Sequence, residues 1–394
     1  MKVGIIGQGS CGVFTAIMLK QLDRNIDIIM FDHNDKTNKK MLATGNGRCN
    51  LGNLRIDKNS YNNEFASQII RKFPIMSQRN FYESIGLETR IIDNLVYPFS
   101  LSSNQVVAYL NKLLKEYKVK LINNSKVDDY IVDDNGVTIN AFGKIYKVDK
   151  LIVATGGISS SSLGSDGVFN KILKAHNYEF TSLKSGLTPI IVNENVKGIE
   201  NERVKCKVSL FINNKLSYEE IGEVLFKKNG LSGISIMNCS SIISRSKSSS
   251  KIKIVLDLFP DISSEILFEK FKKYTGLAGF SFLEGVFTIK MADYIRKNSN
   301  AKNLYKFDIR DIRNIAKYCK NMEFTYKENY SFDNSQVTVG GVDVLQINEN
   351  LESKLESNVF FGGEVLDIDG LCGGYNLMLA CACAKVISDA IAKK

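Results

Sequence analysis

Glycines at a fixed spacing near the start of the chain are the first residues whose pattern could bind a ligand. Gly7, Gly9 and Gly12 form G-x-G-x-x-G, in which a tight turn brings backbone N–H groups against the pyrophosphate of a dinucleotide. Asp32 follows Gly12 by about 20 residues, where a carboxylate binds the hydroxyls of an adenosine ribose. An acid at this place favours FAD or NAD over NADP. A tight turn without a nucleotide is the alternative interpretation.

A polar loop is the second group of residues with binding chemistry. Residues 41–50 read M-L-A-T-G-N-G-R-C-N, so two near-adjacent glycines are followed by Arg48, Cys49 and Asn50. Such a loop offers backbone N–H groups and a guanidinium to an anionic or carbonyl-rich ligand. Its composition alone equally allows a generic polar loop.

The elements that must position these residues follow the order strand, turn, helix and strand. Apolar runs at Lys2–Ile6 and Asp27–Phe31 predict buried strands, and apolar residues at helical spacing predict a helix over Ser10–Leu22. Two later apolar runs, residues 151–154 and 359–361, are followed closely by glycines. Together these runs predict an α/β fold with one parallel sheet and a ligand at the carboxyl ends of its strands.

Two segments of different character interrupt this pattern. Residues 187–258 are rich in strands, and residues 261–320 are helical and basic, with 12 Lys and Arg against 7 Asp and Glu. Residues 324–339 again have the pattern of a strand. We therefore predict a discontinuous nucleotide-binding domain over residues 1–186 and 337–394, a β-rich insert over residues 187–260 and 321–336, and a helical insert over residues 261–320.

Composition narrows the possible chemistry. The 394 residues include only two histidines and eight cysteines, and no C-x-x-C, so we expect no metal site and no Ser-His-Asp triad. The cysteines are typical of reduced thiols in a cytoplasmic protein, and we expect neither a signal peptide nor a membrane span. The net charge of +10 suggests an anionic partner without identifying a fold.

Several motifs in combination resemble one family of flavoproteins. They are the G-x-G-x-x-G turn, residues 41–53, residues 337–342 (V-T-V-G-G-V), residues 363–370 (G-E-V-L-D-I-D-G) and residues 373–376 (G-G-Y-N). With them the chain resembles, over essentially its whole length, the BaiN-type flavoproteins, which are aminoacetone-oxidase-like or NAD(P)/FAD-dependent oxidoreductases. The resemblance implies non-covalent FAD in a glutathione-reductase-like Rossmann domain, with a small β-barrel and a helical bundle inserted.

The resemblance also implies which residues bind FAD. Asp32 would bind the adenosine ribose, and Glu364 would reach the ribityl or pyrophosphate region. A helix predicted over residues 376–393 would place its N-terminus at the pyrimidine edge of the flavin, where N–H groups stabilise negative charge at N1 and O2. The whole predicted cofactor-binding set is Gly7, Gly9, Ser10, Cys11, Gly12, Asp32, His33, Lys40, Gly47, Arg48, Cys49, Asn50, Ala154, Thr155, Gly156, Gly363, Glu364, Gly373, Gly374, Tyr375 and Asn376.

The sequence departs from the family pattern after Gly157. Residues 158–162 read Ile-Ser-Ser-Ser-Ser, where the family tends to have a Ser-Tyr-Pro type of turn. This departure lies where a substrate or nicotinamide would approach the flavin. It therefore leaves the identity of the substrate open.

The catalytic residues are not assigned from the sequence. A flavin carries the hydride itself, while the protein supplies orientation and charge. Tyr375, Cys49 and Arg48 are the candidates nearest the predicted flavin. His33 is predicted beside the adenosine and His176 on an exposed helix face, so neither is a good general acid.

The leading hypothesis is an FAD-dependent oxidoreductase that acts on a small molecule. NAD(P)H would be its transient reductant, and an unsaturated carbonyl compound would receive the hydride, or a small amine or alcohol would be oxidised. The alternative is an RNA-acting or nucleic-acid-docking flavoprotein that uses the basic residues 261–320, although their Lys and Arg are interspersed with acids. A plain NAD dehydrogenase is a third interpretation, and the oligomeric state stays open.

Overall fold

The computed structural model describes residues 1–274, 282–301 and 307–393, and the chain divides into two compact units. The first unit comprises Met1–Lys184 and Ser335–Lys394, and the second comprises Ser185–Asn334. The first unit is therefore discontinuous in sequence, because the second is inserted into it. The short strand β11 (Lys184–Gly186) leads from one to the other.

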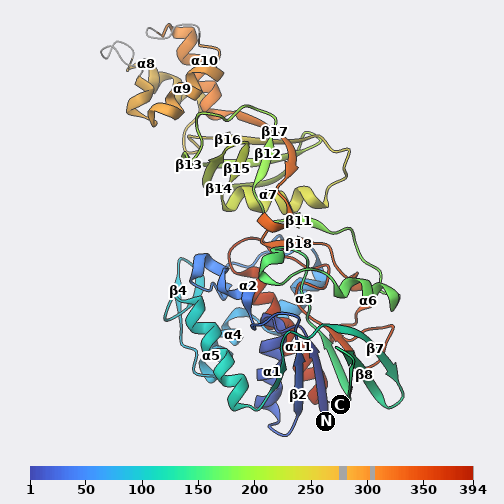
Figure 1. Ribbon diagram of the computed structural model, residues 1–394. Coiled ribbons are helices and arrows are strands. Elements are labelled where there is room, and N and C mark those ends of the chain that lie inside the picture. The colour runs from blue at the N-terminus through green and yellow to red at the C-terminus, as the bar shows by residue number, and fades with distance from the viewer. Residues whose placement is uncertain (275–281, 302–306, 394) are drawn as a thin grey trace. The chain divides into compact units, whose positions relative to one another are not determined.

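A five-stranded parallel sheet forms the centre of the first unit (Figure 1). Ile5 lies opposite Met30 on one side and Ile152 on the other, and all three side chains are fully buried. Because the strands are parallel, their carboxyl ends lie at one edge of the sheet. Their order is β19 (Val359–Phe361), β10 (Lys150–Val153), β1 (Lys2–Ile6), β2 (Asp27–Phe31) and β6 (Lys120–Ile122).

A helix and a second sheet cover opposite faces of this sheet. A Cβ atom on Gly12 would lie 3.2 Å from the Ile5 side chain, whereas a Cβ atom on Gly4 would lie 2.6 Å from Ile139. Neighbouring residues of a strand point to opposite faces, so α1 (Ser10–Leu22) packs on one face and an antiparallel sheet packs on the other. The strands of that second sheet are β7 (Val127–Asp133), β8 (Gly136–Ala141) and β9 (Lys144–Val148).

The helix α11 (Tyr375–Ala392) packs along α1 in the core of the first unit. Its length and apolar composition would suffice for a membrane crossing, yet 67% of it is buried inside the protein. It therefore serves as a core helix. It begins one residue before the predicted helix of residues 376–393.

The other elements of the first unit are mostly short. Asn63 and Ser102 cap two of the helices, because their side chains accept hydrogen bonds from the N–H groups of Ala66 and Gln105. In chain order these elements are α2 (Lys39–Leu42), η1 (Thr44–Gly47), β3 (Gly52–Asn53), α3 (Glu64–Lys72), α4 (Ile75–Ser84), β4 (Thr89–Ile92), β5 (Leu95–Pro98), α5 (Ser103–Glu116), η2 (Ser161–Leu163), α6 (Phe169–Ala175), β18 (Val337–Val339) and η5 (Val344–Gln346).

The second unit contains a closed six-stranded barrel. Its buried interior includes Val208, Leu210, Ile254 and Phe324, and α7 (Ile234–Arg245) packs against its strands. The strand order is β12 (Ile190–Val192), β15 (Gly230–Ser232), β14 (Lys215–Lys227), β13 (Arg203–Ile212), β16 (Ile252–Asp257) and β17 (Met322–Asn329). The parallel sheet and the small barrel predicted from the sequence are thus confirmed.

Among the described residues of the second unit, three α-helices follow the fifth barrel strand. They are α8 (Ser264–Lys272), α9 (Ile289–Asn298) and α10 (Ile309–Lys320), with the short η3 (Phe282–Gly285) before α9. The strand predicted over residues 324–339 is two strands, β17 and β18, because the turn η4 (Phe332–Asn334) interrupts it. The division of this unit into a β-rich and a helical insert at residues 261 and 320 stays a prediction.

Candidate cofactor-binding site

The three glycines of the turn after β1 lie in different surroundings. Gly7 has φ +104°, and a Cβ atom there would lie 2.2 Å from the Ala154 carbonyl oxygen. A Cβ atom on Gly12 would lie 2.2 Å from the Gly7 carbonyl oxygen, whereas one on Gly9 would meet nothing within 4 Å. Gly7 and Gly12 therefore allow close packing of turn, strand and helix. Gly9 instead leaves the backbone open to an approaching ligand.

Asp32, directly after β2, is held in a fixed orientation. Its Oδ2 atom accepts a hydrogen bond of 2.7 Å from the N–H of Gln8, and its Oδ1 atom accepts two of 2.9 Å from Asn34. The next residue, His33, is 42% exposed and lies 3.5 Å from Asp166. The carboxylate of Asp32 thus sits against the glycine turn.

Cys11 belongs to the packing of the core. A Cβ atom on Gly363 would lie 3.1 Å from the Cys11 Cβ atom, so the loop after β19 rests directly on the first turn of α1. Burial, with the neighbouring Cys383, holds the pKa of the Cys11 thiol well above its ordinary value. Ser10 is the first residue of α1.

The polar loop of residues 41–50 contains several residues in the left-handed region. Gly45, Asn46, Gly47 and Cys49 have φ values of +57°, +53°, +81° and +59°. A Cβ atom on Gly47 would meet nothing within 4 Å, and Arg48 is exposed. Within the described residues, the Arg48 guanidinium forms no hydrogen bond or ion pair, so it is available to a ligand.

Cys49, in the same loop, is buried, whereas Arg48 is exposed. The Cys49 side chain has no exposed surface, and burial raises the pKa of the thiol to about 12, although a hydrogen bond with Thr44 opposes this. A thiol with such a pKa is protonated at neutral pH and is a poor nucleophile.

The polar loop meets the start of α11. Gly374 has φ +96°, and a Cβ atom there would lie 2.7 Å from Asn50 Oδ1. Asn53 donates a hydrogen bond of 3.1 Å to the Gly373 carbonyl oxygen. The first turn of α11 has neither a side-chain cap nor an acidic residue. The positive end of this helix therefore lies beside the loop.

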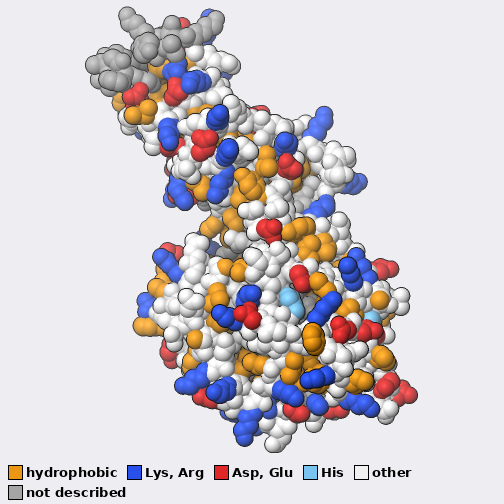
Figure 2. All heavy atoms as spheres, viewed as in Figure 1, with side chains coloured by type: hydrophobic (Ala, Val, Ile, Leu, Met, Phe, Trp, Pro, Cys, Tyr) orange, Lys and Arg blue, Asp and Glu red, His pale blue; other side chains and the backbone are white. Residues whose placement is uncertain are grey.

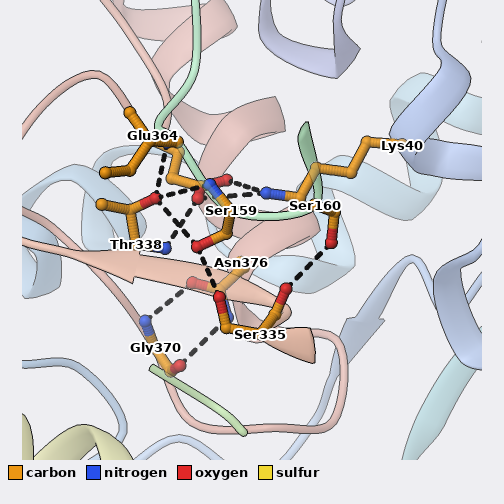
Figure 3. A network of polar contacts seen from close by, with 9 residues as sticks. Lys40, Ser159, Ser160, Ser335, Thr338, Glu364, Gly370 and Asn376 are labelled. Atoms are coloured by element: carbon orange, nitrogen blue, oxygen red, sulfur yellow. Dashed lines mark hydrogen bonds and ion pairs between the residues drawn. The ribbon is translucent and has the colours of Figure 1, made fainter. Parts of the chain in front are cut away.

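Tyr375 and Asn376 use their side chains to hold the loop before α11. The Tyr375 hydroxyl donates a hydrogen bond of 2.5 Å to the Arg55 carbonyl oxygen. The Asn376 amide accepts from the Gly370 N–H at 2.8 Å and donates to the Gly370 carbonyl at 3.0 Å (Figure 3). Both side chains therefore hold backbone segments in place through hydrogen bonds.

Glu364 lies at the meeting point of three segments (Figure 3). Its carboxylate pairs with the Lys40 ammonium at 2.8 and 3.1 Å and accepts a hydrogen bond of 2.8 Å from the Thr338 N–H. Lys40 and Glu364 are 29% and 21% exposed, so the pair is partly open to solvent. It joins α2 to the loop after β19.

Buried polar atoms without partners lie in the segments that follow β1, β2 and β10. Within the described residues, Gln8 Oε1, both amide atoms of Asn38 and the Thr155 hydroxyl have no hydrogen-bond partner. Ala154 and Gly156, which has φ +73°, flank Thr155. A polar ligand at the carboxyl edge of the sheet would supply such partners, and with the open space at Gly9 these residues fit a dinucleotide cofactor.

The structure thus brings most predicted residues to one edge, and it adds others. Thr338 and Asn38 were not in the predicted set. The motif at residues 337–342 and the serines at 158–162 were the sequence signals that could have indicated Thr338. A cavity of about 890 Å³ lies elsewhere in the first unit. It is lined by Lys174 and residues 177–183 and contains none of the predicted site residues.

The parallel sheet has glycines after β1, β10 and β19, and loops at the carboxyl edge surround the candidate site. With the family match, these features identify a Rossmann-type oxidoreductase that depends on FAD. Residues 1–390 match the family described as HI0933-like protein Rossmann domain. The chain belongs to this family, and its resemblance to the BaiN-type flavoproteins is confirmed.

Individual relatives cover the whole chain. It is 29% identical to the 3-dehydro-bile acid delta(4,6)-reductase of Clostridium scindens, over 100% of this chain and 99% of the relative. It is 25% identical to the ribosomal RNA dihydrouridine synthase of Escherichia coli, over 99% of this chain and 98% of the relative. Among solved structures, a 3-ketosteroid-delta4-(5alpha)-dehydrogenase from Rhodococcus jostii RHA1 has a TM-score of 0.49 and 10% identity, over 100% of this chain and 96% of that one.

Proposed function

We propose that this protein is a reductase that takes a hydride from NAD(P)H and delivers it to a carbon–carbon double bond conjugated to a carbonyl. Bound FAD would supply the chemistry of accepting and donating the hydride. The observation that carries the proposal is the contact of Asn50 with Gly374, which brings the N-terminus of α11, with its positive dipole end, beside the polar loop that contains Arg48. The full-length similarity to a 3-dehydro-bile acid delta(4,6)-reductase supports the substrate class.

The residues at the sheet edge have separate tasks in this proposal. The open backbone at Gly9 would receive the pyrophosphate, and Asp32, oriented by Gln8, would accept hydrogen bonds from the adenosine ribose. The α11 N-terminus would lie against the pyrimidine edge of the flavin, where its dipole would stabilise negative charge. Lys40 and Glu364, which form an ion pair, would line the ribityl and pyrophosphate region.

Arg48 is the residue we propose to contact the substrate. Cys49 is protonated and fully buried, and the Tyr375 hydroxyl already donates to the Arg55 carbonyl. Arg48 is exposed on the polar loop and carries a permanent charge. It would bind the substrate carbonyl and stabilise the negative charge that develops there when hydride reaches the conjugated carbon.

Anaerobic mixing tests this proposal. The purified flavoprotein is mixed with NADH or NADPH while the visible absorbance of the flavin is followed, and a 3-oxo-4-ene steroid or an acyclic enone is then added. We expect one nicotinamide to bleach the flavin and an enone to restore its colour. If neither nicotinamide bleaches it, the reductase proposal fails. Arg48→Met should slow reoxidation by the enone while bleaching by the nicotinamide is retained.

A nucleic-acid substrate is the second candidate, because two relatives are ribosomal RNA dihydrouridine synthases. One observation favours it: Arg310, Arg313 and Lys317 are exposed along one face of α10. Most other charges are mixed, as Figure 2 shows on the face drawn. On the barrel, Lys207 pairs with Glu219 at 3.5 Å and Lys253 with Glu323 at 3.0 Å.

A gel-shift titration separates the two candidates. Binding of ribosomal RNA that weakens with salt, and that is lost when the three basic residues of α10 are replaced by Gln, would support the RNA candidate. No binding at low salt would eliminate it. The enone experiment is independent of this outcome, since it uses a small molecule.

We also propose that the protein works in the cytoplasm. Its cysteines Cys11, Cys49, Cys206, Cys239, Cys319, Cys381 and Cys383 are all buried free thiols. Such thiols persist in a reducing compartment. Fractionation of cells that express a tagged chain would test this.

A further inference from the structure

Thr338, in the middle of β18, forms hydrogen bonds with two other segments, the loop after β19 and the residues after β10. Its N–H donates to Glu364 Oε1 at 2.8 Å. Its side-chain oxygen accepts hydrogen bonds from the N–H groups of Ile158 and Ser159 at 2.8 and 3.1 Å. One residue therefore fixes both the carboxylate after β19 and the backbone that follows β10.

The direction of the next hydrogen bond follows from these contacts. A hydroxyl oxygen has two lone pairs and one proton, and the two backbone N–H groups use the lone pairs of Thr338 Oγ1. Its proton is then left for Ser159 Oγ, which lies 3.0 Å away. Ser335 also donates to Ser159 Oγ, at 2.8 Å. Thr338, Ser159 and Ser335 are at most 2% exposed, so water does not compete for these bonds.

The fit around Thr338 is tight. A Cβ atom on Gly157 would lie 2.2 Å from Thr338 Oγ1 and 2.9 Å from Glu364 Oε1. The chain after β10 can therefore pass between these two groups only with glycine at this position. Figure 3 shows Ser159, Thr338 and Glu364 facing one another from three different segments.

We propose that Thr338 is a positioning residue for the FAD site. Its hydroxyl holds Ile158 and Ser159, and its N–H orients Glu364, which in turn pairs with Lys40. These groups are then in place before the cofactor binds, which lowers the cost of ordering them. This inference rests on the proposed binding of FAD at the carboxyl edge of the sheet.

Thr338→Val in the full-length chain is the test, since valine keeps the shape and removes the acceptor for two backbone N–H groups. We expect the FAD dissociation constant, measured by flavin fluorescence, to rise about tenfold or more. Hydrogen exchange of the peptide that contains Ile158 and Ser159 should become faster. Thr338→Ser should restore both properties, because serine keeps the hydroxyl.

The matched control is Thr89→Val. Thr89 is 8% exposed in the same unit, and its hydroxyl accepts from Arg79 and contacts no predicted cofactor segment. This variant should bind FAD like the wild type. If Thr338→Val binds FAD within about twofold of the wild type, or if Thr338→Ser fails to restore binding, the inference is overturned. A wild-type chain that binds no FAD would instead overturn the proposed function itself.

Discussion

The side-chain oxygen of Asn50 occupies the space that a side chain on Gly374 would need, with only 2.7 Å between Asn50 Oδ1 and the Cβ position. The polar loop after β2 and the first turn of α11 can therefore touch only because residue 374 is glycine. This contact brings the Arg48 loop and the helix N-terminus to the same place.

Gly374→Ala should weaken FAD binding. Alanine at φ +96° is strained by about 1–3 kcal/mol, and its methyl group would push Asn50 away. We expect a lower thermal midpoint and an FAD affinity reduced by about tenfold or more, measured by fluorescence titration.

Gly143→Ala is the control for this change. Gly143 also has positive φ, at +71°, but a Cβ atom there would meet nothing within 4 Å. Its hairpin contains no predicted cofactor residue. Equal loss of FAD affinity in both variants would show that backbone strain, and not the contact with Asn50, is responsible.

Lys40 and Glu364 should act as a coupled pair. Because both side chains are partly exposed, we expect an interaction free energy of only about 1 kcal/mol. A double-mutant cycle of Lys40→Met and Glu364→Gln, with chemical unfolding of the flavin-free chain, measures it. Additive effects of the two substitutions would contradict the pairing.

Cys49 should resist alkylation in the folded protein. Burial raises the pKa of its thiol to about 12, so the reactive thiolate is scarce at neutral pH. Iodoacetamide followed by peptide mass spectrometry should label Cys372, which is partly exposed, well before Cys49. Cys49→Ala should retain enone reduction, whereas loss of the hydride-transfer step alone would restore Cys49 as a catalytic candidate.

His176 should make stability depend on pH. Its burial opposes a positive charge, but hydrogen bonds with Glu356 at 2.7 Å and Asp129 at 2.9 Å outweigh this and raise its pKa above 6.5. A raised pKa stabilises the folded chain at low pH, and this stabilisation is lost as pH rises through the folded-state value. The free energy of unfolding should therefore fall as pH increases above about 6.5.

The other histidine provides the comparison. His33 is 42% exposed, and His33→Gln should keep the pH dependence in urea unfolding series. His176→Gln should flatten it. An unchanged slope in His176→Gln would rule out this histidine as its source.

Features that rest on backbone geometry could be predicted from the sequence. Gly7 and Gly12 are needed because a Cβ atom on either residue would lie 2.2 Å from a backbone carbonyl oxygen. That oxygen belongs to Ala154 in the case of Gly7, and to Gly7 in the case of Gly12. This requirement leaves a regular spacing in the sequence. The strands Lys2–Ile6 and Asp27–Phe31 and the helix Ser10–Leu22 were predicted with the boundaries observed.

Contacts between distant side chains could not be predicted in the same way. His176 was predicted to be exposed, which is wrong, because Asp129 on β7 and Glu356 before β19 enclose it and leave it 16% exposed. The helical pattern around residue 176 contains no sign of either acid. Thr338 was overlooked for the same reason, since its partners at residues 158 and 159 lie before the inserted unit.

The insertion of residues 185–334 also orders the steps of biosynthesis. β19 is an edge strand of the parallel sheet and α11 lies against α1, yet both are translated after the second unit. The second unit has a hydrophobic core of its own and can fold while the ribosome is still adding the rest. The parallel sheet of the nascent chain therefore stays incomplete until β19 has been translated. The face of α1 that α11 covers stays exposed until α11 has left the ribosome. With α11 at the flavin, as we propose, flavin loading would be a late event that follows translation of this helix.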